Sequence, residues 1–298
     1  MRFKTTSVFI TSAIIAFLLP LSCSNTMPVE EDIKTISDEF KSFWYQGKAE
    51  VANYKLIQSR YGELREGDAS FIFVTEPFDP ERLVKKETPG ETTSVFKVNH
   101  TRKFVTGIYP YSIMTSSFTE VETKKAAEVL KTTHSSQEWC GQTWSQLNRS
   151  GKGYNLEQYS YFEQEGDVSA QFPYAQLEDG IWAQIRFNPG QLPQGKFDAI
   201  PAFHFLRFSH IPVQAYDAVG TLAKEDRWTY TLDYLELNRK LEIEFEGNFP
   251  YRILGWKEID KRNPNRSTSG ELVHSEMLSY WNLNAKADTV YRQSFGLK

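Results

Sequence analysis

The sequence predicts a mainly β protein with a single antiparallel β domain, built as a curved sheet or partly open barrel, or as a sandwich. Three observations support this prediction. About ten segments show the two-residue alternation of strands and are joined by short turns. Long helical segments do not alternate with them, so a parallel α/β sheet is not expected. Hydrophobic residues make up 40% of the 298 residues, enough to bury a substantial core.

Residues 1–22 predict a lipoprotein signal peptide. Two basic side chains precede an uncharged apolar stretch at 8–21, which has the length of a signal-peptide core and is too short for a comfortable membrane span. Ser22 supplies the small residue before the cleavage site, and Cys23 resembles the lipid-modified cysteine of a bacterial lipobox. Pro20 departs from that pattern, since leucine is usual there. The alternative is an ordinary secretory signal that contains a cysteine.

Lipid attachment at Cys23, with palmitate-type acyl chains, predicts a protein anchored to a bacterial membrane without spanning it. We expect the cell envelope, at the outer membrane, with the leaflet and the direction it faces left open. Residues 23–31 are polar and small and predict a tether, which leaves 32–298 as the single β-rich domain. Cys140 would be the only side-chain thiol left unmodified in the mature chain, so no intramolecular disulfide is expected.

Two helices are expected, one at each end of the domain. Ile33, Ile36, Phe40 and Phe43 recur at helical spacing, and three acidic residues precede them, as suits the positive end of a helix dipole. A short closing helix is expected over 286–295.

The strands are predicted from alternation and turn residues. The clearest is 240–246, where Leu241, Ile243 and Phe245 face one way and the glutamates between them face water. Two hairpins are indicated by turn-forming residues at 63–68 and at 149–153. The remaining strand candidates are 49–60, 70–75, 95–98, 103–118, 143–148, 154–162, 202–210, 228–233 and 271–281.

Charge and motifs exclude several classes of function. A formal net charge of −4 argues against a nucleic-acid partner. No phosphate-binding loop, dinucleotide fingerprint, nucleophile elbow or zinc-protease motif occurs, so neither a cofactor nor a metal is expected. His204 and His210 are near in sequence, but six residues of strand separate them by about 20 Å, too far to share one zinc ion.

Cys140 is the one candidate for a reactive thiol. The run from Gln137 to Trp144 resembles part of the papain-type signature, but Thr143 stands at the position of that nucleophile, so the similarity is read as coincidence. Between Trp139 and Trp144, Cys140 is expected to be a small buried residue with a packing role.

Aromatic residues are abundant, with 7 Trp, 15 Tyr and 21 Phe. Tyr109, Tyr111, Trp139 and Trp144 lie within a short stretch and are the candidate binding residues, because aromatic side chains line lipid- and glycan-binding β domains. The alternative is that they fill an ordinary β core.

Six segments together resemble an uncharacterised family of envelope lipoproteins from Bacteroidota-type bacteria. They are SRYGE at 59–63, FVTEPF at 73–78, TGIYPYSIM at 106–114, QEWCGQ at 137–142, LNR at 237–239 and FPY at 249–251. Many members are labelled "septum formation inhibitor Maf", a name that belongs to α/β nucleotide pyrophosphatases. Those enzymes carry a Ser-x-Arg-Arg phosphate motif, from which residues 59–62 depart, so the label is not expected to describe the chemistry.

The sequence therefore predicts a lipid-anchored envelope protein, more an uncharacterised binding protein than an enzyme. Its partner would be an apolar ligand, a glycan or another envelope protein. The alternative is an envelope hydrolase with a glycosidase-like pair of carboxylates, which can meet only in space. A nucleotide pyrophosphatase is the third and least favoured reading. A long apolar groove would favour binding, and two carboxylates about 5–10 Å apart in a cleft would favour hydrolysis.

Overall fold

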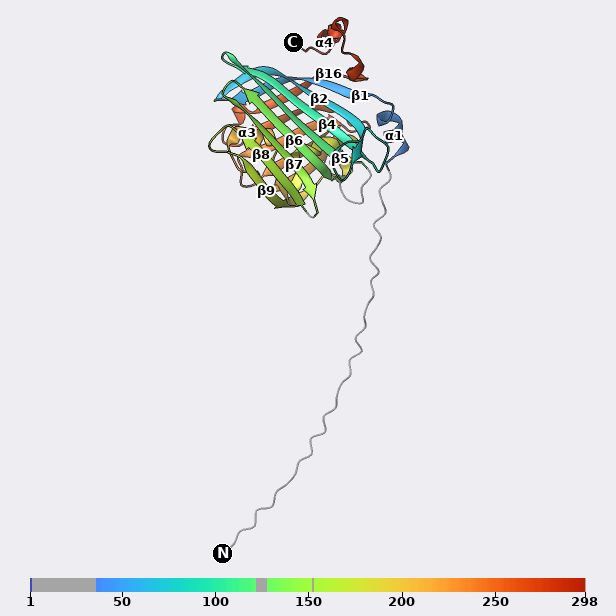
Figure 1. Ribbon diagram of the computed structural model, residues 1–298. Coiled ribbons are helices and arrows are strands. Elements are labelled where there is room, and N and C mark those ends of the chain that lie inside the picture. Colours follow the sequence, from blue (N-terminus) through green and yellow to red (C-terminus); the bar gives the residue numbers. More distant parts are fainter. Residues whose placement is uncertain (2–35, 122–127, 152, 298) are drawn as a thin grey trace. The chain divides into compact units, whose positions relative to one another are not determined.

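The computed structural model describes residues 1, 36–121, 128–151 and 153–297, and the fold reported below belongs to the compact unit Ile33–Lys298. Within the described residues this unit contains helix α1 (Asp38–Trp44) followed by one sheet of sixteen strands (Figure 1). The expected N-terminal helix is confirmed over α1, where Ser37 caps the helix by accepting the N–H of Phe40 at 3.1 Å. The predicted signal peptide, the tether and Cys23 lie outside the described residues.

The first nine strands form a meander in which neighbours in sequence pair antiparallel, except that the short β3 pairs only with β2 and β2 pairs onward with β4. Tyr61 and Gly62, at φ of 54° and 78°, form the two-residue turn between β1 and β2, as a type I′ hairpin requires. The predicted loop at 63–68 is wrong, because these residues are strand. Gly67 lets β2 approach β4 closely, because a Cβ atom added to it would lie 2.3 Å from the carbonyl oxygen of Lys103. The strands are β1 (Ala49–Arg60), β2 (Glu63–Asp79), β3 (Val84–Lys85), β4 (Thr93–Thr106), β5 (Tyr109–Glu120), β6 (Val129–Glu138), β7 (Gly141–Ser150), β8 (Gly153–Ser160) and β9 (Val168–Pro173).

The second half of the chain forms another meander, with helices inserted near its start. Only β10 and β11 pair in parallel, because helix α2 connects them. The elements are β10 (Gln176–Leu177), α2 (Glu178–Phe187), η1 (Pro189–Gln191), β11 (Gly195–Ile200), α3 (Phe203–Ser209), β12 (Tyr216–Lys224), β13 (Arg227–Tyr234), β14 (Arg239–Glu246), β15 (Ile253–Asp260), η2 (Pro264–Arg266), β16 (Thr268–Leu278), η3 (Tyr280–Asn282), η4 (Lys286–Thr289) and α4 (Val290–Ser294). The expected closing helix is confirmed by η4 and α4.

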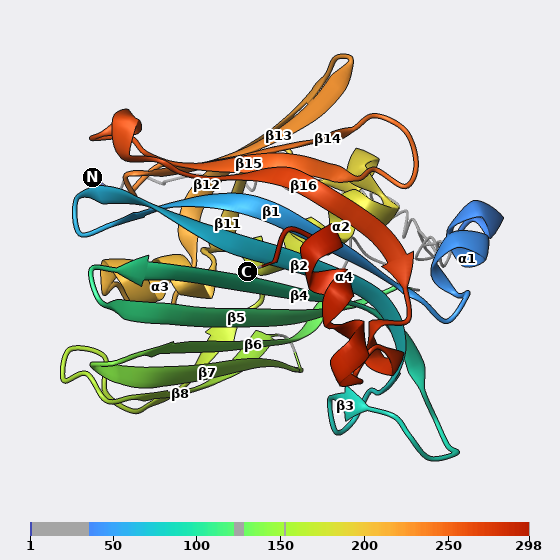
Figure 2. The ribbon, with the colours of Figure 1, turned by 90° about the horizontal axis from the view of Figure 1, so that it is seen from above.

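The two meanders join at one seam, where β1 pairs antiparallel with β16 (Figure 2). The sheet then runs from β10 at one edge to β9 at the other. Only Tyr174 and Ala175 separate these two edge strands in sequence, and so short a linker spans about 10 Å. The sheet must therefore curl until its edges approach each other, although β9 and β10 do not pair. The predicted antiparallel fold is confirmed in its curved, partly open form.

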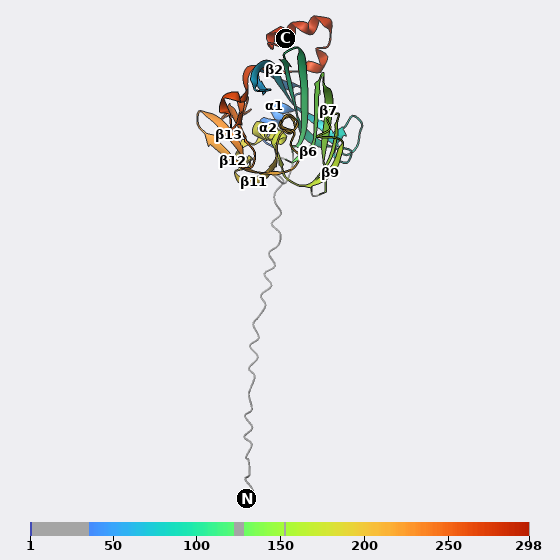
Figure 3. The same cartoon turned by 90° about the vertical axis from the view of Figure 1, so that its left-hand side faces the viewer.

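Helices α2 and α3 fill the inside of this curve and were not expected. Figure 3 shows α2 between the two wings of the sheet, and its residues 178–186 are all buried. The helix also buries the charged residues Glu178, Asp179 and Arg186, whose sequence is typical of an exposed segment and did not predict a helix in the core. The predicted strand at 202–210 is wrong. The alternating rings of Phe203 and Phe205 imitate a strand, but the segment forms α3 and ends at His210 in the left-handed conformation.

The strand predicted at 240–246 is confirmed as β14. Leu241, Ile243 and Phe245 are 0–1% exposed, and the glutamates between them are partly exposed. Their inward face joins a core rich in aromatic rings, where Phe71 and Trp256 meet edge to face at 5.5 Å. Most aromatic residues of the domain thus serve an ordinary β core.

One ion pair is sealed inside this core. Arg186 of α2 donates two hydrogen bonds to the carboxylate of Glu50 on β1, one of them at 2.8 Å. Its guanidinium also lies 5.1 Å from the centre of the Trp44 ring and 4.6 Å from that of Phe73. Burial alone would raise the pKa of Glu50, but the adjacent Arg186 outweighs it and lowers that pKa. The pair therefore stays ionised and ties α2 to the sheet.

Candidate functional site

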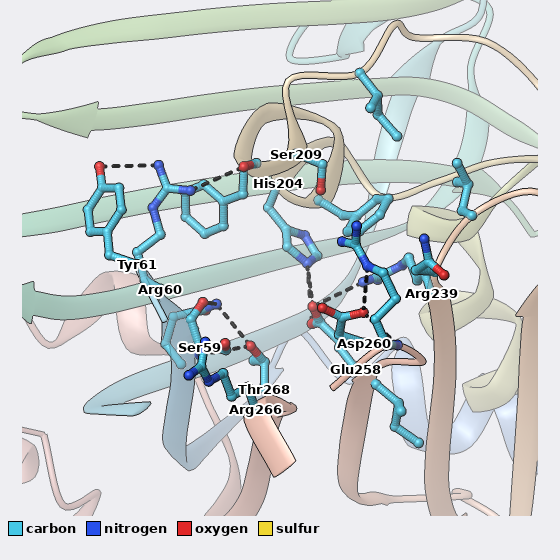
Figure 4. Close-up of a pocket in the computed structure, with 18 of the residues that line it drawn as sticks. Ser59, Arg60, Tyr61, His204, Ser209, Arg239, Glu258, Asp260, Arg266 and Thr268 are labelled. Atoms are coloured by element: carbon cyan, nitrogen blue, oxygen red, sulfur yellow. Dashed lines mark hydrogen bonds and ion pairs between the residues drawn. The ribbon is translucent and has the colours of Figure 1, made fainter. Parts of the chain in front are cut away.

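A cavity of about 450 Å³ opens over the seam between the meanders. Its walls come from β1, β14, β15, β16 and α3, elements far apart in sequence that the curl of the sheet brings together (Figure 4). The Ser59 N–H donates to Thr268 Oγ1 at 3.0 Å across this seam. The site therefore depends on both halves of the chain.

The floor of this cavity is a buried cluster of charges centred on Glu258 of β15. The Glu258 carboxylate accepts hydrogen bonds from Arg102, from Arg239 at 3.2 Å and from His204 of α3 at 3.1 Å. None of these four side chains is more than 9% exposed. Arg102 also donates to His100 at 3.2 Å. The cluster thus joins β4, β14, β15 and α3.

Arg239 extends the cluster to the start of α2. It donates to both carboxylate oxygens of Glu178, and the Tyr234 hydroxyl donates to the same carboxylate at 2.8 Å. Glu178 lies in the first helical turn, where a negative charge interacts favourably with the helix dipole. Two arginines and two glutamates therefore alternate across the interior, and their formal charges cancel.

The charge states of this floor follow from burial and neighbours. Burial alone would raise the pKa of Glu258, but Arg102, His204 and Arg239 together hold that pKa well below its ordinary value. Burial, reinforced by Arg102, lowers the pKa of His204. At neutral pH the imidazole is therefore neutral and donates its Nε2–H to an ionised carboxylate. Glu258 is a fixed anion with its partners in place, which suits a structural or nucleophilic role and not that of a general acid.

Arg60 lies at the mouth of the cavity and is held by aromatic side chains. Its guanidinium lies 4.4 Å from the ring centres of both Tyr61 and Phe208. It donates to the Phe208 carbonyl at 3.1 Å and to the Tyr61 hydroxyl at 3.3 Å, and its buried Nε has no hydrogen-bond partner among the described residues. In that part of the chain no carboxylate forms an ion pair with Arg60. The mouth therefore presents a positioned cation.

The candidate binding residues Tyr109, Tyr111, Trp139 and Trp144 do not form one site. Tyr111 is buried, and its hydroxyl lies 2.8 Å from that of Tyr61. It therefore helps to position Tyr61 at the cavity mouth. Tyr109 lies between Tyr111 and Trp139, with ring centres 5.8 and 6.3 Å apart. Trp144 faces outward on β7 and stacks on Tyr159 at 5.8 Å. Their role in binding stays a prediction.

The expected burial of Cys140 is wrong, since this residue is exposed. Trp139 and Cys140 form the turn between β6 and β7, and the Cys140 N–H donates to Glu138 at 2.8 Å. A hydrogen bond and the negative charge of Glu138 raise the pKa of the thiol. The residue lacks the packing role expected of it, and its raised pKa is the opposite of what a nucleophilic thiol needs.

The sequence did contain a signal for the floor residues. Arg102, Arg239 and Glu258 each occupy an inward-facing position of a strand, next in phase to Phe104, Leu241 and Trp256. A charge in the apolar phase of a strand must find a partner inside the protein. What the sequence could not give is which charges meet, because the partners lie up to 156 residues apart.

Comparisons with known proteins align the chain with one solved structure. No family model matches, and no curated protein matches. The crystal structure of a beta-barrel-like protein of the domain of unknown function DUF1849, from Brucella abortus, aligns over 77% of this chain and 98% of its own, with 8% identity and a TM-score of 0.47.

No helix in the described residues is long and apolar enough to cross a membrane. Nor do those residues contain a group of three or more His, Cys, Asp or Glu side chains that could hold a metal ion.

Proposed function

We propose that this protein is a non-enzymatic binding protein of the cell envelope, and that the cavity over the seam takes a small ligand with one anionic group and an apolar or ring-shaped body. The observation that carries this proposal is Arg60, a cation held at the cavity mouth without a carboxylate partner among the described residues. A guanidinium fixed in this way matches a carboxylate, phosphate or sulfonate group.

The lining of the cavity supports the same ligand chemistry. Four arginines face three acidic residues there, and one of the acids, Glu258, is already neutralised by Arg102 and Arg239. The rings of Tyr61, Phe205 and Phe208 supply apolar surface beside the charge. A ligand that is both anionic and apolar would contact both parts of this wall. Of the three partner classes predicted from the sequence, this chemistry favours the apolar ligand.

Arg60→Gln is expected to weaken binding of the anionic aromatic dye anilinonaphthalene sulfonate. A hydrogen bond to a charged group contributes about 1.5–3 kcal/mol, so the Kd from a fluorescence titration should rise about 10- to 100-fold. The matched control is Arg227→Gln, which removes an exposed arginine that pairs with Glu244 on β14, outside the cavity. Equal Kd values for the two variants would show that the dye does not use this cavity.

The envelope hydrolase remains the second candidate, because one observation favours it. Glu258 and Asp260 point from the same face of β15 into the cavity, at the spacing of about 7 Å that two residues along a strand give. This is the spacing of the two backbone positions, from which the carboxyl groups can reach the separation of a glycosidase pair. If the protein hydrolyses nitrophenyl glycosides and Asp260→Asn abolishes this activity, the hydrolase is established. If the wild type does not hydrolyse them, the binding function stands.

The antiparallel sheet is not the α/β arrangement of nucleotide pyrophosphatases, so that activity is not proposed.

The envelope location rests on the predicted lipid at Cys23, and we expect Cys23→Ala to release the protein from the membrane fraction or to leave it unprocessed. Metabolic labelling with a palmitate analogue detects the lipid, and membrane fractionation shows whether the protein has been released. A variant that is cleaved normally and still sediments with membranes would show that the lipid is not on this residue.

A further inference from the structure

Four of the most exposed large apolar side chains lie at one end of the sheet. Connections in a meander alternate between the two ends, so the turns β1–β2, β4–β5 and β6–β7 and the loop after β8 share one end (Figure 2). These connections carry Tyr61, Ile108, Trp139 and Tyr161, which are 58–81% exposed. We call these four residues the apolar rim.

The apolar rim is continuous, because contacts link its turns. Tyr61 and Trp139 are joined through the two tyrosines of β5, whose rings lie between them. The β6–β7 turn lies against Tyr161 in the same way, since a Cβ atom added to Gly141 would be 2.9 Å from the ring of that tyrosine. The four side chains therefore belong to one surface.

The connections at the opposite end of the sheet have a different character. The β12–β13 turn consists of Glu225 and Asp226, and the β2–β3 connection contains Glu81 and Arg82, all of them exposed. A single exposed apolar residue is ordinary on a protein surface, but a contiguous set marks a site of interaction with a protein or a membrane.

The chemistry at this end favours a membrane. Tyrosine and tryptophan combine an apolar ring with a polar group and are enriched at the boundary between membrane and water. At the same end, the turn between β15 and β16 carries Lys261, Arg262 and Arg266, with Asp260 as the one acid in the segment 260–266. The positive charge of this turn complements the anionic headgroups of a bilayer.

We propose that the apolar rim docks on the surface of a membrane that contains anionic lipids, with Ile108, Trp139 and Tyr161 inserted among the headgroups. None of these three residues lines the seam cavity, so the docking does not depend on the ligand proposed for that cavity. It is also independent of the predicted lipid on Cys23.

The test uses the full-length chain with Cys23→Ala, which leaves Cys140, next to Trp139 in the β6–β7 turn, as the only side-chain thiol. A nitrobenzoxadiazole label on Cys140 should brighten and shift to the blue when vesicles of phosphatidylcholine and phosphatidylglycerol are added. Ile108→Asp should raise the lipid concentration at half of that signal about ten- to hundredfold, because an apolar side chain is no longer buried in the bilayer. Vesicles of phosphatidylcholine alone should also require more lipid, since they lack anionic headgroups.

Two controls show whether the apolar rim is responsible. Val290→Asp makes a comparable change at an exposed residue of α4, outside the rim, and should leave the signal unchanged. A label on Glu225→Cys, in a chain that also carries Cys140→Ala, should stay in water because it lies at the opposite end of the sheet. Ile108→Asp should melt at the temperature of the parent chain, because Ile108 makes little contact with the core.

Three results would overturn the proposal. If the label on Cys140 stays in water with both kinds of vesicle, the partner of the rim is not a membrane. If the labels at Cys140 and at Glu225→Cys respond alike, or if Ile108→Asp behaves like its parent, the protein contacts the vesicle through another surface. None of these results affects the dye titration of the seam cavity, so the two proposals fail separately.

Discussion

Ile243→Asp is expected to unfold the domain. Ile243 is 0% exposed and lies between Tyr230 and Trp256, its partners on the neighbouring strands. An aspartate there would place a charge in an apolar core without a partner, which costs several kcal/mol. That is a large part of the roughly 5–15 kcal/mol that stabilises an ordinary domain. Circular dichroism should show loss of the β signal or a greatly lowered thermal midpoint.

Glu244→Lys is the matched control, because it changes the charge of the next residue on the opposite face of the same strand. Glu244 is partly exposed and pairs with Arg227 at the surface. Such pairs contribute about 0–1 kcal/mol, so the midpoint should move by only a few degrees. If Ile243→Asp melts like the wild type and Glu244→Lys does not fold, the register of β14 is reversed. A folded Ile243→Asp that has lost only ligand binding would mean that this face lines an open groove.

Arg186→Met is expected to cost about 3–5 kcal/mol, because it leaves the buried carboxylate of Glu50 without its cation. Methionine is chosen since it keeps most of the apolar length of the side chain beside Trp44 and Phe73. Urea denaturation followed by tryptophan fluorescence gives the free energy of unfolding of each variant.

The double variant Glu50→Gln, Arg186→Met decides whether the charge is the cause. Removing both charges leaves no uncompensated ion, so the double variant should recover most of the stability lost in Arg186→Met. The introduced glutamine would keep a carbonyl oxygen as an acceptor for the Ser275 hydroxyl, which now donates to Glu50 at 2.9 Å. A double variant as unstable as the single one would show that the loss came from packing and not from the unpaired charge.

The elements predicted correctly are those whose two faces meet different surroundings. Strand β14 separates core from water at every second residue, so its register can be deduced from the sequence. Helix α2 could not be found in this way, because its charged residues Glu178, Asp179 and Arg186 are buried as well, so no face of the helix meets water. Helix α3 resembles a strand in sequence because its aromatic residues alternate, and only the tertiary packing of Leu206 and Phe203 decides otherwise.

The site was harder to predict than the fold because its residues are distant in sequence and become neighbours only in the folded protein. Glu258 meets Arg102 and His204 only after the sheet has curled and α3 has packed inside it. The aromatic residues chosen from their density in sequence occupy different surroundings, and Tyr111 supports the seam cavity through its contact with Tyr61. Local density of a residue type says what a segment can bind, but it does not say which segments meet.

The seam between β1 and β16 has a thermodynamic consequence. It is the one strand pairing in the described sheet that joins the two halves of the chain, and the cavity with Arg60 and Glu258 lies directly over it. A ligand bound there touches both halves, so its binding free energy adds to their cohesion. At a concentration of 100 times its Kd, such a ligand would add about 2.7 kcal/mol to the work of separating them. Ligand binding should therefore make the whole domain more resistant to unfolding by force and to proteolysis.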